Sequence, residues 1–215
     1  MMVMSKHPGL SDFHMDALRE ISNIGLGNAI TSLAQLVNRR INMDVPLATF
    51  MPFEKTVSLV GGDEELVSCV SVRLSGEVPG LVLFIFSSQS TLKLVDMLMG
   101  LEPGTTTELD EMGESAVMEV GNVLTGSFIG AIYSMTSLQI QSAVPMFAHD
   151  MLGAILTSLM VASGRIEDQV LVIETRLFQE RSESSISGHF FMVTEPGATE
   201  KLFSAMGLSI SQHTV

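Results

Sequence analysis

Cysteine, basic side chains and long apolar runs are all scarce in this sequence of 215 residues. Eleven Lys and Arg stand against 24 Asp and Glu, so the formal net charge is −13 and the pI is near 4.6. Proteins that bind duplex nucleic acid or an anionic membrane surface use clustered Lys and Arg to neutralise phosphates. The basic residues here are scattered, which argues against both functions and leaves a partner with a basic surface as the better fit.

Cys69 is the only cysteine, so it can form no internal disulfide and supply no thiolate-rich metal site. A reducing compartment is the simplest setting for such a chain. The sequence begins without the basic and apolar leader typical of secretion. Its longest apolar runs fall short of the roughly 18 residues that a spanning helix needs. We therefore expect a cytoplasmic protein that inserts into no membrane.

Familiar catalytic and metal-binding motifs are missing as well. The five histidines are scattered and form no Ser/His/Asp arrangement, and neither an H-E-x-x-H motif nor a GxxxxGK[ST] phosphate loop occurs. Without a nucleophile, a metal cluster or a phosphate loop, no motif supports the hypothesis of an enzyme that acts on a small molecule. We expect the chain to bind no metal or cofactor of its own.

The two halves of the chain resemble each other. Aligning residue n with residue n+99 over positions 16–46 gives eight identities without a gap, and "TLKLVDMLMGL" at 91–101 matches "TEKLFSAMGL" at 199–208 further on. A duplication is the economical interpretation. It predicts a single domain over 1–215, built from a first repeat at 12–101 and a second at 108–208.

Each half predicts the same order of elements. A long helix, a β-rich segment, a short helix, a β-hairpin and a closing helix follow one another in both: 12–37, 41–51, 53–60, 66–86 and 88–99, then 109–136, 138–147, 149–162, 169–194 and 196–206. Hairpins of this kind favour an α+β fold over a doubly wound parallel sheet. We expect a pseudo-twofold arrangement in which the strands of both halves share one sheet and the helices pack on it.

Both long helices carry the same polar stripe. At 100° per residue, one face of each helix presents a short polar residue, a glutamate, an asparagine and a glycine: Asp16, Glu20, Asn23 and Gly27, then Ser115, Glu119, Asn122 and Gly126. The opposite faces are apolar, from Leu18 to Leu36 and from Val117 to Met135. A glycine inside a helix costs about 1 kcal/mol relative to alanine. Its recurrence on the polar face indicates room kept for an approaching partner.

A single exposed Glu/Asn pair is ordinarily a solvated helix face, but this pair recurs at the same spacing in two otherwise divergent copies. Asparagine neither takes up a proton nor attacks, yet it can hold a water molecule, as a glutamine does in GTPases. Phosphoryl transfer depends mostly on such positioning. The glutamate can form a charge-assisted hydrogen bond to a Lys or Arg of the substrate. The metal and the phosphoryl group would then have to come with a protein substrate.

The pattern [D/S]-x-x-x-E-x-x-N, with a proline 23 positions beyond the asparagine, resembles the signature of the CheC/CheX/FliY family of chemotaxis phosphatases. It is met twice, ending at Pro46 and again at Pro145, and the resemblance covers essentially the whole chain. Two sites in one chain differ from the single site of CheX. FliY appends a flagellar-switch domain, whereas only "SISQHTV" follows the last predicted helix here. The related switch protein FliM has lost the Glu/Asn pairs, so the CheC branch is the most similar.

The resemblance implies a two-component signalling enzyme that hydrolyses the phospho-aspartate of the response regulator CheY. It implies that Glu20 and Glu119 contact the active-site lysine of the regulator, and that Asn23 and Asn122 orient the attacking water. The Mg²⁺ ion would belong to the regulator. Asp16 and Ser115 would support the first turn without being catalytic, and the two prolines would be structural.

The family also implies CheD, a receptor deamidase that raises the phosphatase activity, as a partner. The candidate docking segment is 149–162, in which Asp150 is the only acidic residue, although a buried core helix explains that segment equally well. Two other classes of function stay open. One is a non-enzymatic adapter that binds CheY, CheD or the flagellar switch through the same face, and the other is an enzyme of a different class.

Overall fold

The computed structural model describes residues 11–37, 40–163, 169–179 and 185–209. Six helices and seven strands occur in these ranges: α1 (Asp12–Val37), β1 (Ile41–Pro52), α2 (Phe53–Val60), β2 (Leu66–Gly76), β3 (Gly80–Ser87), α3 (Ser88–Met99), α4 (Glu111–Thr136), β4 (Ile140–Ser142), β5 (Met146–Met151), α5 (Leu152–Ser163), β6 (Gln169–Gln179), β7 (Ser185–Thr194) and α6 (Ala198–Ala205). The predicted α+β class and the predicted order of elements are confirmed.

One predicted segment is divided. Residues 138–147 were expected to form one β-rich stretch, but they form β4 and the start of β5, separated at Pro145. Proline has no N–H to give to a strand ladder, so the pairing with β2 is interrupted there. The helix expected from residue 149 begins only at Leu152, because residues 146–151 pair with β2. Asp150 therefore lies on a strand and not on a helix.

All strands join one antiparallel sheet. The order is β1-β6-β7-β3-β2-β4, and β5 also pairs with β2. The two hairpins β2–β3 and β6–β7 meet at the centre through β3 and β7, and each carries the β-rich segment of the other half on its outer strand. The strand order is therefore symmetric: exchanging each strand for its equivalent in the other half gives the same pairing. It is the arrangement expected of the predicted duplication.

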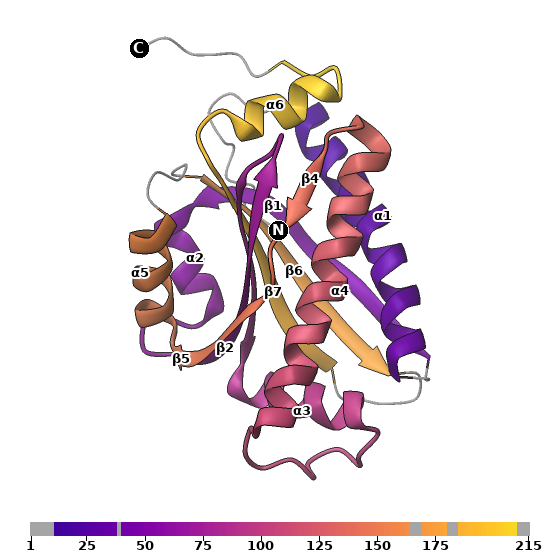
Figure 1. Cartoon of the computed structure of the whole chain (residues 1–215), viewed down its shortest axis with the longest axis vertical. Helices are drawn as coiled ribbons and strands as arrows, with labels where there is room; N and C mark the ends of the chain where they lie inside the picture. The colour runs from indigo at the N-terminus through magenta and orange to yellow at the C-terminus, as the bar shows by residue number, and fades with distance from the viewer. Residues whose placement is uncertain (1–10, 38–39, 164–168, 180–184, 210–215) are drawn as a thin grey trace.

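Helices cover both faces of the sheet, as Figure 1 shows. The long helices α1 and α4 lie side by side on one face, with α3 and α6 at their ends, and α2 and α5 cover the other face. The larger core lies under α1 and α4, and a second core lies under α5. Because β3 is central and covered on both faces, its sequence GLVLFIFS is buried almost throughout and not alternating.

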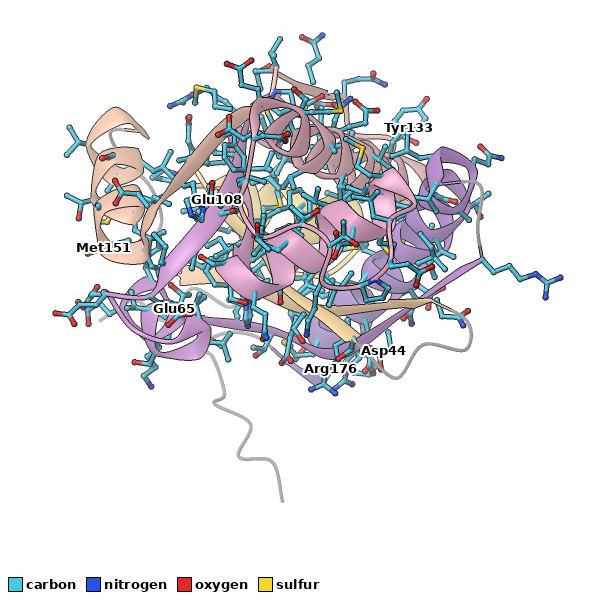
Figure 2. All side chains as sticks on the ribbon, turned by 90° about the horizontal axis from the view of Figure 1, so that it is seen from below. Asp44, Glu65, Glu108, Tyr133, Met151 and Arg176 are labelled. Atoms are coloured by element: carbon cyan, nitrogen blue, oxygen red, sulfur yellow. The ribbon has the colours of Figure 1, made fainter. Side chains whose placement is uncertain are left out.

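β1 is an edge strand, and its pairing with β6 gains one extra residue between Asp44 and Leu47. Pro46 lies within this bulge, a position that tolerates a residue with no N–H. Asp44 and Arg176 are cross-strand partners and lie close together in Figure 2. The structural role that the resemblance implies for this proline is consistent with its place.

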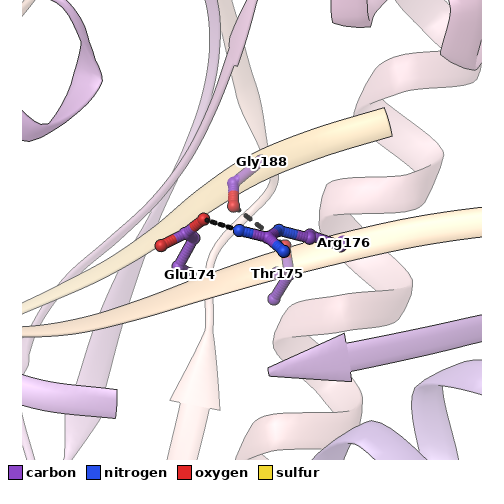
Figure 3. A network of polar contacts seen from close by, with 4 residues as sticks. All are labelled: Glu174, Thr175, Arg176 and Gly188. Carbon is purple, nitrogen blue, oxygen red and sulfur yellow. Dashed lines mark hydrogen bonds and ion pairs between the residues drawn. The ribbon is translucent and has the colours of Figure 1, made fainter. Parts of the chain in front are cut away.

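At the β6–β7 ladder, consecutive residues of β6 make a buried hydroxyl contact and a partly exposed ion pair (Figure 3). The Thr175 hydroxyl donates to the carbonyl of Gly188 at 3.1 Å, and the Arg176 guanidinium contacts the Glu174 carboxylate at 3.3 Å. His189 is the cross-strand partner of Glu174, and burial lowers the pKa of its imidazole, although the nearby Glu174 charge acts in the opposite direction.

One helix in the described part of the chain, α4, is long and apolar enough by length and composition to cross a membrane. Of its most apolar window, 44% is buried inside the protein. That burial is against α1, α3 and the sheet, which is the environment of a core helix.

Candidate functional site

The two polar stripes lie on a pair of antiparallel helices. α1 begins beside α6, where the His14 ring meets the ring of Phe203 edge-on at 4.7 Å between centroids. α4 begins beside α3 at the opposite end of the pair, where a Cβ on Gly113 would lie 3.3 Å from a methyl carbon of Val95. Gly113 is the n+99 counterpart of His14. Each long helix therefore begins beside the closing helix of the other half, a symmetry that fits the predicted duplication.

A glycine lets the two helices approach each other. A Cβ on Gly25 of α1 would be 3.4 Å from the Cα of Phe128 and 3.6 Å from the Cβ of Ala131, both in α4. The predicted apolar faces are buried here, from Leu18 to Ala29 in α1 and from Val117 to Phe128 in α4. Since these faces point to the core, the polar stripes are turned to the outer surface of the helix layer.

The first stripe is exposed and has few internal contacts. Glu20 and Asn23 are both exposed, and neither side chain makes a hydrogen bond or an ion pair with any residue that the structure describes. Asp16 is occupied by a neighbour, because its carboxylate accepts from the Arg19 guanidinium at 2.9 Å. The glutamate and the asparagine are therefore free to bind a group from outside the chain.

The second stripe repeats this arrangement on α4. Glu119 and Asn122 are exposed, and within the described ranges their side chains have no hydrogen-bond or ion-pair partner either. The hydroxyl of Ser115 donates to the carbonyl of Glu111 at 2.8 Å, a bond along the helix itself. Asp16 and Ser115 thus hold local contacts in the turn before each Glu, consistent with a supporting role and not a chemical one.

The glycines on the stripes are not there for packing. A Cβ added to Gly27 or Gly126 would meet nothing within 4 Å, and the same holds for Gly130 one turn further along α4. Gly121 on the buried face of α4 is different, because a Cβ there would lie 2.5 Å from Cγ1 of Val70. About one turn beyond each asparagine, the stripe therefore exposes the helix backbone at a glycine.

Small-molecule binding has little support at the helix pair. The cavity beneath α1 and α4 has a volume of about 30 Å³ and is lined mainly by apolar side chains, with Ser22 and Thr175 as the polar ones. Ligand pockets have volumes of about 300–1,000 Å³, at least ten times larger. Among the residues described, no group of three or more His, Cys, Asp or Glu side chains is placed to hold a metal ion.

A buried aspartate fixes the loop that leads into α4. One carboxylate oxygen of Asp96 accepts from the Gly104 amide at 2.7 Å, and the other accepts from the Thr106 amide at 2.8 Å. Burial raises the pKa of this carboxyl, but the hydrogen bonds from Thr106, Gly104 and Thr105 outweigh burial and lower it overall. The loop then reaches Asp110, which caps α4 by accepting from the Gly113 amide at 2.8 Å.

The candidate docking segment has one buried and one exposed side. Leu152, Ile155 and Leu156 of α5 are buried against the sheet, whereas Met160 and Val161 are exposed. Asp150 is exposed on β5, and its carboxylate accepts from the Met151 amide at 2.7 Å. α5 is therefore a core helix on its sheet side, and a docking role for its exposed side stays a prediction.

Two further residues extend the stripes, and the Glu/Asn/Gly pattern does not point to them. Phe13 and Met112, the second residues of α1 and α4, are exposed. They are n+99 counterparts, three residues before Asp16 and Ser115, so the internal repeat is the sequence signal that relates them.

Comparison with known proteins places this geometry in a family. A model of the CheC-like family matches residues 13–48, which contain the first stripe, and a model of the chemotaxis phosphatase CheX matches residues 68–165, which contain the second. The CheY-P phosphatase CheC of Bacillus subtilis is 32% identical over 209 residues, covering 96% of this chain and all of that protein.

Solved structures share the fold. The crystal structure of FliY from Thermotoga maritima superposes with a TM-score of 0.75 at 23% identity, covering 92% of this chain and 98% of that one. A complex of CheX with CheY, BeF₃ and Mg²⁺ from Borrelia burgdorferi has a TM-score of 0.50 at 15% identity, covering 83% of this chain and 99% of that one.

Proposed function

The chain belongs to the CheC family of CheY-P phosphatases, and from this membership we propose that it hydrolyses the phospho-aspartate of CheY at two sites, one on α1 and one on α4. The observation that carries the proposal is the recurrence on both helices of an exposed Glu/Asn pair that has no partner in the described ranges, each pair followed by a glycine with open space above it. Each helix face enters the active site of the regulator in turn or together with the other.

The glutamates anchor the regulator. Glu20 and Glu119 are exposed carboxylates with no partner among the residues that the structure describes, so neither has to break a bond to one of these residues before it accepts one from a lysine of CheY. A charge-assisted hydrogen bond of this kind is shorter and about twice as strong as a neutral one. It fixes the register of the helix against the regulator.

The asparagines position the water. Asn23 and Asn122 lie three residues after the glutamates, about one turn along the same face, so each is placed when its glutamate is bound. The carboxamide offers one acceptor and two donors, enough to hold a water molecule in line with the phosphorus–oxygen bond. The water adds to phosphorus, the bond to the aspartyl oxygen breaks, and inorganic phosphate leaves.

The charge that develops in this reaction is neutralised by groups of the regulator, where we place the Mg²⁺ ion. The chain itself supplies positioning and exclusion of bulk water, which together account for a large part of the catalysis of phosphoryl transfer. The open backbone at Gly27 and Gly126 lets the regulator approach the asparagine closely.

A kinetic test separates the two roles. Phosphorylated CheY is mixed with Glu20→Ala or Asn23→Ala, each in an Asn122→Ala background that leaves only the α1 site. Loss of the glutamate should raise KM, whereas loss of the asparagine should lower kcat with binding retained. Asn28→Ala, an exposed asparagine of α1 off the stripe, is the matched control and should change neither.

The same assay distinguishes a phosphatase from a non-enzymatic adapter. If the chain binds phosphorylated CheY but leaves its lifetime unchanged, with CheD present or absent, the Glu/Asn faces serve recognition only.

We further propose that CheD docks on the exposed side of α5 together with Asp150. Met160 and Val161 are exposed near the C-terminal end of α5, and Asp150 is exposed just before its N-terminal end, a surface suited to a partner whose apolar and basic groups lie about one helix length apart. Val161→Asp and Asp150→Asn should weaken CheD binding measured by titration calorimetry, whereas Val144→Asp, at an exposed residue outside α5, should not. Equal binding by all four proteins would remove this surface from consideration.

A further inference from the structure

Each candidate helix begins with a large apolar side chain turned to solvent. Phe13 in the first turn of α1 is 75% exposed, and Met112 in the first turn of α4 is 65% exposed. First turns of helices favour Asp, Glu and Ser, which complement the helix dipole and the free N–H groups. A single exposed apolar residue needs no explanation. Two of them at equivalent positions of the two halves do.

The spacing places both residues on the polar stripes. Phe13 precedes Glu20 by seven residues, and Met112 precedes Glu119 by the same number. Seven residues turn a helix by about 700°, some 20° short of two full turns, and advance it by about 10 Å. Each apolar side chain therefore lies on the same face as the carboxylate that follows it, about two turns away.

The neighbours of these residues point elsewhere, so the exposure is not a fraying of the whole turn. His14 is buried next to Phe13, with its ring against Phe203. Gly113 is buried next to Met112, with its amide bonded to the cap residue Asp110. Contacts on the buried side of each first turn thus hold it in place, while Phe13 or Met112 on its outer side is exposed to solvent.

We propose that Phe13 and Met112 are the apolar anchors by which the two sites dock the phosphorylated response regulator. This inference rests on the proposed function and extends it to the choice of partner. The complete stripe reads apolar anchor, polar support, carboxylate, carboxamide and open backbone. Its complement is a regulator surface with an apolar depression about 10 Å from the active-site lysine. A regulator without that depression is discriminated against even though its active site is the same.

The anchors act on binding and not on the chemical step. They lie about two turns from the glutamate and further still from the asparagine, so they touch no reacting atom. Burying a mostly exposed Phe or Met side chain supplies a substantial share of the binding free energy of a standard interface. Truncation of such an anchor weakens binding about tenfold. We therefore expect KM to rise about tenfold and kcat to stay constant.

The experiment isolates one site at a time. In the Asn122→Ala background, which leaves the α1 site, Phe13→Ala should raise KM for phosphorylated CheY and Met112→Ala should not. In the Asn23→Ala background, which leaves the α4 site, the effects should exchange. Phe13→Leu and Met112→Leu should restore KM, because they restore apolar volume. Val144→Ala, which trims an apolar residue that is 85% exposed on the loop before β5, is the control and should leave KM unchanged.

Three results would overturn the proposal. The first is an unchanged KM in both backgrounds. The second is an equal loss at both sites from either variant, which would mean that the substitution disturbs the fold. The third is a loss of self-association in Phe13→Ala measured by light scattering, which would assign the anchors to contact with a second copy of this chain.

A binding measurement tests the anchors even if the chain proves to have no phosphatase activity. If the unmodified chain does not shorten the lifetime of phosphorylated CheY, the anchors are still tested by titrating CheY activated with beryllofluoride. A dissociation constant unchanged in the Phe13→Ala/Met112→Ala double variant then overturns them, and an increase of tenfold or more supports them.

Discussion

The glycines of the polar stripes offer a prediction in which stability and activity change in opposite directions. Gly126 lies in the interior of α4 and is exposed, and a Cβ there would meet nothing within 4 Å. Replacement by alanine restores helix propensity worth about 1 kcal/mol and adds no clash. For a domain of this size, that gain corresponds to a rise in Tm of about 2–4 °C. Gly27→Ala in α1 should give a similar rise for the same reason.

Gly121 in the same helix is the matched control with the opposite sign. Its Cβ would lie 2.5 Å from Cγ1 and 2.9 Å from Cβ of Val70, so alanine there crowds the contact between α4 and β2. Overpacking of this kind costs about 1–3 kcal/mol, more than the propensity gained. Denaturation with urea, read by circular dichroism, should therefore rank Gly126→Ala above the unmodified chain and Gly121→Ala below it.

Activity decides why the exposed glycine is there. In the Asn23→Ala background, which leaves the α4 site, Gly126→Leu should reduce hydrolysis of phosphorylated CheY, because its side chain fills the space kept for the regulator. The fold should persist, since the position is open to solvent. Unreduced hydrolysis by Gly126→Leu would refute the idea that the glycine makes room, and a lack of stabilisation in Gly126→Ala would refute the helix energetics behind it.

Three other predictions concern single side chains away from the stripes. Because hydrogen bonds lower the pKa of Asp96 in the folded state, it contributes stability that is present above its unfolded pKa near 4 and lost as the pH falls through the folded value. Asp96→Asn should cost about 1–3 kcal/mol at pH 7 and flatten the acid limb of urea denaturation. Burial raises the pKa of the Cys69 thiol to about 12, so a thiol reagent at pH 8 should label it only as the chain unfolds. Arg176→Ala should change the free energy of unfolding by less than about 1 kcal/mol, since its ion pair with Glu174 is exposed.

Much of the fold follows from patterns within each segment. The helix at 12–37 and the hairpins around 66–86 and 169–194 are confirmed, because long amphipathic periodicity and paired apolar runs are local signals. The order in which the hairpins join was expected only in outline, since it depends on pairing between distant strands. The pairing of β5 with β2 also joins distant segments, so the sequence did not predict it. Because of this pairing, Asp150 lies on a strand and not on the expected helix.

Periodicity predicts which face of a helix a side chain lies on, but it does not predict how far along the helix that face stays packed against the protein. Leu36 lies on the apolar stripe of α1, and its expected burial is wrong: it is 47% exposed in the last turn of the helix. Leu33, one turn earlier, is buried. In the same way, the sequence placed Glu20 and Glu119 on helix faces correctly. That the side chains of these two glutamates have no partner among the described residues could be learned only from the contacts around them.

The two-site mechanism is tested most directly by the lifetime of phosphorylated CheY in the presence of four proteins: the unmodified chain, Asn23→Ala, Asn122→Ala and the double variant. This mechanism predicts that each single substitution lowers the hydrolysis rate and that the double substitution removes the acceleration while CheY still binds. A double variant that hydrolyses phosphorylated CheY as fast as the unmodified chain would contradict it, because water positioning by the two asparagines would then not be the source of the activity.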